Sequence, residues 1–181
     1  MNLDGKKVVL VGMGRSTTAA ARLMLARGAR PFITESSDAP RLAPWRAQCL
    51  EMGVPFEIGG HTMDAFEDAD LVVTSPGVPV NTDLFAAVRL RAVPVIGELE
   101  LASRFCRSRI IALTGTNGKT TATELLRAMV AACGRTVDLA GNNDRPLSLV
   151  ALMDEQPEFV VVEASSYQLE TADTFHPWLA C

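Results

Sequence analysis

The sequence predicts an α/β protein with parallel sheets, and two observations carry this prediction. Short apolar runs alternate along the chain with longer stretches of helical periodicity, the pattern of parallel α/β structure. Residues 7–12 and 109–114 are nearly uninterrupted apolar runs, as in strands buried on both faces. Each run is followed by a turn that contains glycine and then by a predicted helix, so the same pattern occurs twice. With 48% hydrophobic residues in 181, the chain can build a buried core.

The first module is predicted over residues 1–96. Its strands are predicted at residues 7–12, 31–34, 70–74 and 93–96. The helices between them are predicted at residues 16–27, 44–52 and 82–91. In the first helix Ala20, Leu23 and Met24 recur at helical spacing, and Gly28 follows as a natural stop.

The second module is predicted over residues 109–181, after a connection at residues 97–108 that has mixed charge and weak periodicity. Its strands are predicted at residues 109–114, 136–140 and 159–162, and its helices at residues 118–132 and 146–153. Residues 176–181 resemble the beginning of a further strand without a helix after it. A module with so few strands would expose a sheet edge, so we expect either that the chain is a fragment or that something else covers this edge.

Composition limits the kinds of partner. The formal net charge is −4, from 17 basic and 21 acidic side chains, which favours a small-molecule partner over nucleic acid. The widely spaced Cys49, Cys106, Cys133 and Cys181 are predicted to be free thiols. The N-terminus does not resemble a signal peptide, and no apolar stretch reaches the ~18–20 residues that span a bilayer. We therefore expect a cytoplasmic protein without a membrane partner; the sequence does not determine its oligomeric state, and a monomer is the expectation.

The strongest motif is TGTNGKTT at residues 114–121, which lies between an apolar strand and a helix. Its glycines would let backbone N–H groups point at phosphate oxygens, beside the positive end of the helix. Lys119 would neutralise the β- and γ-phosphates of ATP, and the Thr120 hydroxyl would ligate Mg²⁺. The general G-x-x-x-x-G-K-[ST] motif has a glycine where this chain has Leu113, and the alternative is a structural turn with an incidental lysine. The predicted ATP-binding residues are Gly115, Thr116, Asn117, Gly118, Lys119, Thr120 and Thr121.

An acidic residue follows the last predicted apolar strand. Glu163 lies at the carboxyl end of residues 159–162, where ligands bind in such sheets. A carboxylate there suits Mg²⁺, so Thr120 and Glu163 are the predicted metal ligands, and Lys119 and Glu163 the predicted catalytic residues. The alternative is that Glu163 only caps a helix beginning near Ser165.

A second glycine turn, Gly12-Met13-Gly14, follows the first strand. Thr17 stands where a dinucleotide-binding turn has its third glycine, and Glu35 follows about twenty residues on. NAD binding is therefore an open but unfavoured alternative, because Thr17 would hinder close helix packing. The turn could instead hold another nucleotide diphosphate or serve the fold alone.

Three motifs together resemble the Mur ligases: TGTNGKTT at residues 114–121, Gly141-Asn142, and EASSYQLE at residues 163–170. Residues 165–170 are most similar to the members that add D-glutamate. Ser75-Pro76-Gly77 and residues 97–100 are further matches, so the resemblance covers the whole chain. Residues 143–145 (Asn-Asp-Arg) depart from the family, which usually has an apolar or small residue and then glycine after Gly-Asn.

The resemblance implies three domains. Residues 1–96 would form a Rossmann-like domain for the UDP moiety, and residues 109–181 the first part of the central ATPase. The substrate-binding residues that it implies are Gly14, Arg15, Ser16, Ser36, Ser37, Ser75, Asn142, Ser165 and Ser166. The family's metal-binding histidine, modified lysine and C-terminal domain would lie beyond Cys181, so the chain is expected to be an incomplete N-terminal part and inactive alone.

The reaction implied is an ATP-dependent ligation in peptidoglycan synthesis, with ATP and Mg²⁺ as cofactors. ATP would phosphorylate the carboxylate of UDP-N-acetylmuramoyl-L-alanine, and the amine of D-glutamate would attack the acyl phosphate. The alternatives are another Mur ligase, a folylpolyglutamate synthase-like ligase, or a nucleotide-binding module without catalysis.

Overall fold

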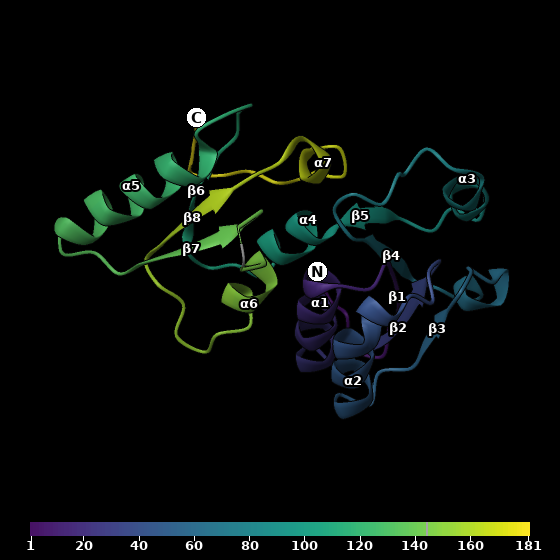
Figure 1. Ribbon diagram of the computed structural model, residues 1–181. Coiled ribbons are helices and arrows are strands. Elements are labelled where there is room, and N and C mark those ends of the chain that lie inside the picture. Colours follow the sequence, from purple (N-terminus) through teal and green to yellow (C-terminus); the bar gives the residue numbers. More distant parts are fainter. Residues whose placement is uncertain (144) are drawn as a thin grey trace. The chain divides into compact units, whose positions relative to one another are not determined.

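The computed structural model describes residues 1–143 and 145–181. The chain divides into two compact units, Met1–Glu98 and Leu99–Cys181 (Figure 1). Each unit contains a parallel sheet with helices between its strands, which confirms the α/β prediction. In the described part of the chain no helix combines the length and the apolar character needed to cross a membrane.

The first unit has a five-stranded sheet in the order β3-β2-β1-β4-β5, with all neighbours parallel. This order is that of a Rossmann fold, as predicted. The strands are β1 (Lys7–Val11), β2 (Arg30–Glu35), β3 (Phe56–Ile58), β4 (Leu71–Thr74) and β5 (Val95–Gly97). The helices are α1 (Arg15–Ala26), α2 (Ala43–Glu51) and α3 (Asp83–Leu90), with 3₁₀ turns at Pro40–Leu42 and Met63–Phe66. Strand β3 was not predicted, because a three-residue edge strand carries too little periodicity.

The core of the first unit explains why β1 is an unbroken apolar run. Val9 and Val11 pack with Phe66 and with Phe85 of α3. Side chains alternate between the two faces of a strand, and the intervening residues of β1 are buried as well. Helix α1 packs on β1 and β2. Both faces of the sheet are therefore covered.

The second unit has a four-stranded parallel sheet in the order β7-β8-β6-β9. The strands are β6 (Arg109–Leu113), β7 (Val137–Gly141), β8 (Phe159–Glu163) and β9 (Leu179–Ala180). The helices are α4 (Glu98–Ser103), α5 (Lys119–Ala132), α6 (Leu147–Ala151) and α7 (Ser166–Leu169). The strand expected within residues 176–181 is β9. The four cysteines are free, as predicted.

The segment expected as a connection, residues 97–108, contains helix α4. Its periodicity is obscured because Glu100 lies in it and is fully buried. The Glu100 carboxylate accepts hydrogen bonds from the backbone N–H groups of Asp173, Thr174 and Phe175, from the Thr174 hydroxyl and from Arg104. Burial alone would raise the pKa of Glu100, but these hydrogen bonds lower its pKa to about 2. Glu100 thereby ties the segment between α7 and β9 to α4.

Candidate functional site

Strand pairing in the second unit brings three sequence motifs to one edge of the sheet. Leu113 at the end of β6 and Gly141 at the end of β7 are both in register with Glu163 at the end of β8. All three strands run parallel, so the segments that follow them meet at the carboxyl edge. This edge is where ligands bind in such sheets.

The phosphate-loop motif forms an exposed turn at that edge. Residues 114–118 are all exposed, and Gly118 adopts the left-handed conformation, with φ of 77°, as the N-cap of α5. The Lys119 amine donates to the Gly115 carbonyl at 2.8 Å and lies 3.5 Å from the Thr116 carbonyl. A glycine-rich turn at the start of a 14-residue helix, with an ammonium group on it, suits phosphate groups.

Glu163 has an environment that fits a divalent cation. Glu163 is 3% exposed, and its Oε2 accepts a hydrogen bond of 2.8 Å from the Thr120 hydroxyl. Its Oε1 accepts one of 3.0 Å from the Asn142 side-chain amide. Both donors are neutral, and burying a carboxylate is costly unless a positive charge compensates it. A carboxylate beside a hydroxyl is an oxygen donor set that suits Mg²⁺.

The alternative role for Glu163, capping a helix near Ser165, is wrong. Ser165 itself is the N-cap of α7: its hydroxyl accepts from the Gln168 N–H, and the Gln168 side chain accepts from the Ser165 N–H. Ser165 therefore has a structural function beside the substrate contact expected of it. Ser166 begins α7 and is exposed at the same edge of the sheet.

The six site residues expected in the first unit also follow strand ends. Gly14, Arg15 and Ser16 follow β1. Ser36 and Ser37 follow β2, and Ser75 follows β4, so all six residues lie at the same edge of the sheet. Glu35 links two of these loops, because its carboxylate accepts the N–H groups of Met13 and Ser37, each at 2.8 Å. In a dinucleotide-binding fold the corresponding carboxylate accepts hydrogen bonds from the ribose hydroxyls. The Glu35 carboxylate already accepts from the Met13 and Ser37 N–H groups, which weighs against NAD binding.

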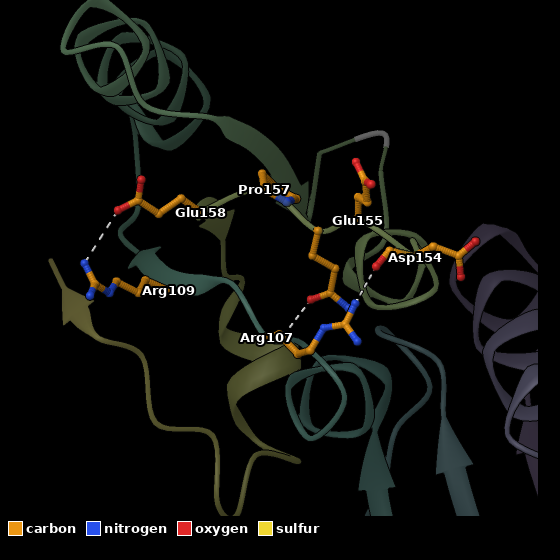
Figure 2. Close-up of a pocket in the computed structure, with 7 residues that line it drawn as sticks. Arg107, Arg109, Asp154, Glu155, Pro157 and Glu158 are labelled. Atoms are coloured by element: carbon orange, nitrogen blue, oxygen red, sulfur yellow. Dashed lines mark hydrogen bonds and ion pairs between the residues drawn. The ribbon is translucent and has the colours of Figure 1, made fainter.

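A pocket at the other end of the second sheet is a poor nucleotide site (Figure 2). Arg109 begins β6 and Glu158 directly precedes β8, so the pocket lies at the amino ends of the strands. Its two arginines already have partners: Arg109 pairs with Glu158 at 3.7 Å, and Arg107 donates to the Asp154 carbonyl at 2.6 Å. The phosphate loop is at the opposite edge.

Two family patterns match separate parts of the chain. Residues 6–97 match the Mur ligase MurD-like N-terminal domain, and residues 113–176 match the Mur ligase middle domain. The chain belongs to the Mur ligase family. This confirms the resemblance drawn from the three motifs.

Named relatives agree with this membership. The UDP-N-acetylmuramoylalanine–D-glutamate ligase of Desulfosudis oleivorans is 43% identical over 177 residues, which are 98% of this chain and 39% of that protein. The ligase of the same name from Desulfatibacillum aliphaticivorans is 42% identical over 180 residues, 99% of this chain and 40% of that protein. The chain thus spans about two fifths of the length of these relatives.

Solved structures extend the agreement to the fold. The UDP-N-acetylmuramate:L-alanyl-gamma-D-glutamyl-meso-diaminopimelate ligase from Neisseria meningitides matches with a TM-score of 0.61 at 19% identity. The match covers 97% of this chain and 59% of that one. At this identity it supports the Mur ligase fold alone.

Several contacts in this Mur ligase chain could not be predicted from the sequence. Asn142, expected at a substrate diphosphate, directs its side-chain amide to Glu163. Of the residues that depart from the family pattern, Asn143 accepts from the Arg145 N–H and the Arg145 guanidinium pairs with Asp138, while Asp144 lies outside the described residues. The contact of Met13 with Glu35 also depends on strand pairing, and no local signal reveals it.

Proposed function

We propose that the chain forms the UDP-substrate domain and the beginning of the ATP-binding domain of a ligase that joins D-glutamate to UDP-N-acetylmuramoyl-L-alanine. The observation that carries the proposal is the contact between the Thr120 hydroxyl and the buried Glu163 carboxylate, next to the exposed phosphate loop. The names of the two relatives support the choice of substrates. Family membership supports ATP and Mg²⁺ as cofactors.

The residues of the second unit would bind and orient ATP. The turn of residues 114–118 would hold the phosphates, and Lys119 would exchange its bond to the Gly115 carbonyl for a phosphate oxygen. Thr120 and Glu163 would hold Mg²⁺, which neutralises phosphate charge when bound. Neutralisation and positioning matter here because the reaction brings two anions together, the substrate carboxylate and the γ-phosphate.

The proposed reaction has two steps. The substrate carboxylate takes the γ-phosphoryl group and ADP leaves. The amine of D-glutamate then attacks the acyl carbon, phosphate leaves, and the amine loses a proton.

In the first unit, the loops at Gly14–Ser16, Ser36–Ser37 and Ser75 would hold the UDP part of the substrate. Ser166 and the Ser165–Gln168 turn would lie toward the muramoyl group.

The test is phosphate release by the full-length gene product supplied with ATP, Mg²⁺ and UDP-N-acetylmuramoyl-L-alanine. We expect release with D-glutamate and little with L-alanine, L-lysine or meso-diaminopimelate. Preference for one of the other amino acids would contradict the substrate assignment. Nucleotide binding without release would favour a non-catalytic module.

A further inference from the structure

Asn142 holds Glu163 at two points. Its backbone N–H donates to the Glu163 carbonyl at 2.7 Å, and its side-chain Nδ2 donates to Glu163 Oε1 at 3.0 Å. One residue thus restrains both the main chain and the carboxylate of Glu163. The orientation of the carboxylate therefore depends on the end of β7 as well as on β8.

The close approach of the two strand ends requires glycine before Asn142. Gly141 has φ of 108°, and a Cβ atom there would lie 2.2 Å from the Glu163 carbonyl oxygen. No side chain fits at that distance. The Gly141 N–H also donates to the Arg145 carbonyl at 2.9 Å, which closes the turn that presents Asn142. The Asn142 amide is therefore brought to Glu163 by the backbone of β7 and this turn.

The two oxygens of Glu163 have different partners. Oε2 faces the Thr120 hydroxyl, and Oε1 faces the Asn142 amide. Thr120 and Glu163 would hold a cation, and the hydrogen bond from the Asn142 amide would restrain the carboxylate that binds it. A neutral amide suits this role because it orients the carboxylate without cancelling its charge, as a lysine or arginine would.

We propose that Asn142 is a positioning residue that orients the Glu163 carboxylate for Mg²⁺. This inference rests on the proposed function, because it assumes that Glu163 and Thr120 hold the metal. It differs from a direct substrate contact in one respect: Asn142 acts through Glu163. Removing its amide should weaken metal binding even when no UDP substrate is present.

The experiment measures Mn²⁺ binding to the full-length protein by electron paramagnetic resonance, with a non-hydrolysable ATP analogue and without UDP substrate. For Asn142→Ala we expect the Mn²⁺ Kd to rise about 10-fold. Affinity for the analogue in EDTA and the Tm should change little. Asn142→Ser should show the same loss of Mn²⁺ affinity, because the serine side chain is too short to reach Oε1 of Glu163. This variant replaces Asn142→Ala in the experiment if the alanine variant does not fold. An unchanged Mn²⁺ Kd in either folded variant overturns the inference.

The matched control is Asn143→Ala in the same turn. The side-chain oxygen of Asn143 accepts a hydrogen bond from the Arg145 N–H. We expect its Mn²⁺ Kd to stay within about 2-fold of wild type, because the carboxylate keeps its amide partner. A loss equal to that of Asn142→Ala would mean that the turn as a whole matters, and would overturn the specific role of the Asn142 amide.

A double-mutant cycle with Glu163→Gln separates this inference from the proposed function. If Asn142 acts through Glu163, its removal should add little to the loss already caused by Glu163→Gln. Fully additive losses would overturn the inference and leave the metal site intact. If Glu163→Gln alone leaves the Mn²⁺ Kd unchanged, the metal assignment in the proposed function fails instead.

Discussion

The turn after β1 and the loop after β6 share the local order of strand, glycine turn and helix, yet their backbones have different surroundings. In the first unit Gly12 and Met13 are buried, and the Met13 N–H is bonded to Glu35. In the second unit residues 114–118 are all exposed. The Lys119 amine there bonds carbonyl groups of its own loop.

This difference favours the loop after β6 over the turn after β1 as the proposed triphosphate site. The Met13 amide is occupied by the Glu35 carboxylate, whereas the exposed loop carries a cation that can exchange a carbonyl for a phosphate oxygen. Similar local sequence therefore leads to different chemistry, according to the side chains that the neighbouring strands bring to the turn.

The largest effect is expected from Lys119→Ala. Loss of the loop's cation should lower the kcat/KM for ATP of the full-length protein by about 100-fold or more. The measurement is ADP release with saturating UDP substrate. Arg127→Ala, on the same helix and ion-paired with Glu124, is the charge-matched control and should leave turnover near wild type. Equal losses in both variants would remove the distinction between the two turns.

The two units should also differ in acid sensitivity, because Glu100 stabilises the second. Its pKa is lowered from 4.5 to about 2 in the folded protein, so its contribution is complete above pH 4.5 and is lost as the pH falls toward 2. Allowing for solvent screening, we expect about 1–3 kcal/mol. Urea unfolding at pH 7 and pH 3 should show this loss in wild type and a smaller one in Glu100→Gln. Identical pH dependence in the two proteins would contradict the assignment.

Gly141→Ala should destabilise the second unit through contact with Glu163. Gly134→Ala is the matched control, because Gly134 also has positive φ, 73°, but open space where Cβ would lie. We expect about 1 kcal/mol for the control and about 2 kcal/mol more for Gly141→Ala. Thermal unfolding measures the difference. Equal Tm changes would show that the strand ends are not closely packed.

The smallest effect is expected in the first unit. Glu35→Gln leaves one carbonyl oxygen for the N–H groups of Met13 and Ser37, which should cost about 1 kcal/mol. Hydrogen exchange at Met13 should become faster, and affinity for a UDP-sugar should fall a few-fold. Glu51→Gln, at an exposed position of α2, should change neither. Unchanged hydrogen exchange at Met13 in Glu35→Gln would contradict the contact between Met13 and Glu35.

Contacts along a short stretch of chain were predictable from the sequence. The phosphate loop is contiguous: an apolar strand, a glycine turn and a helix beginning at Lys119 each carry a local signal. Buried parallel strands are also locally marked, because both of their faces need apolar side chains. Those signals sufficed for the α/β class, for the turn that suits phosphate and for the Mur ligase resemblance.

The contacts between residues of different motifs were decided by the tertiary structure alone. The contact of Asn142 with Glu163 spans 21 positions and exists because β7 pairs with β8. The burial of Glu100 depends on backbone N–H groups 73 to 75 positions away. A charged residue in a segment predicted as a connection is therefore a buried residue of helix α4. Such contacts depend on strand register and chain reversal, which are set by packing of the whole unit and leave no periodic trace in the residues concerned.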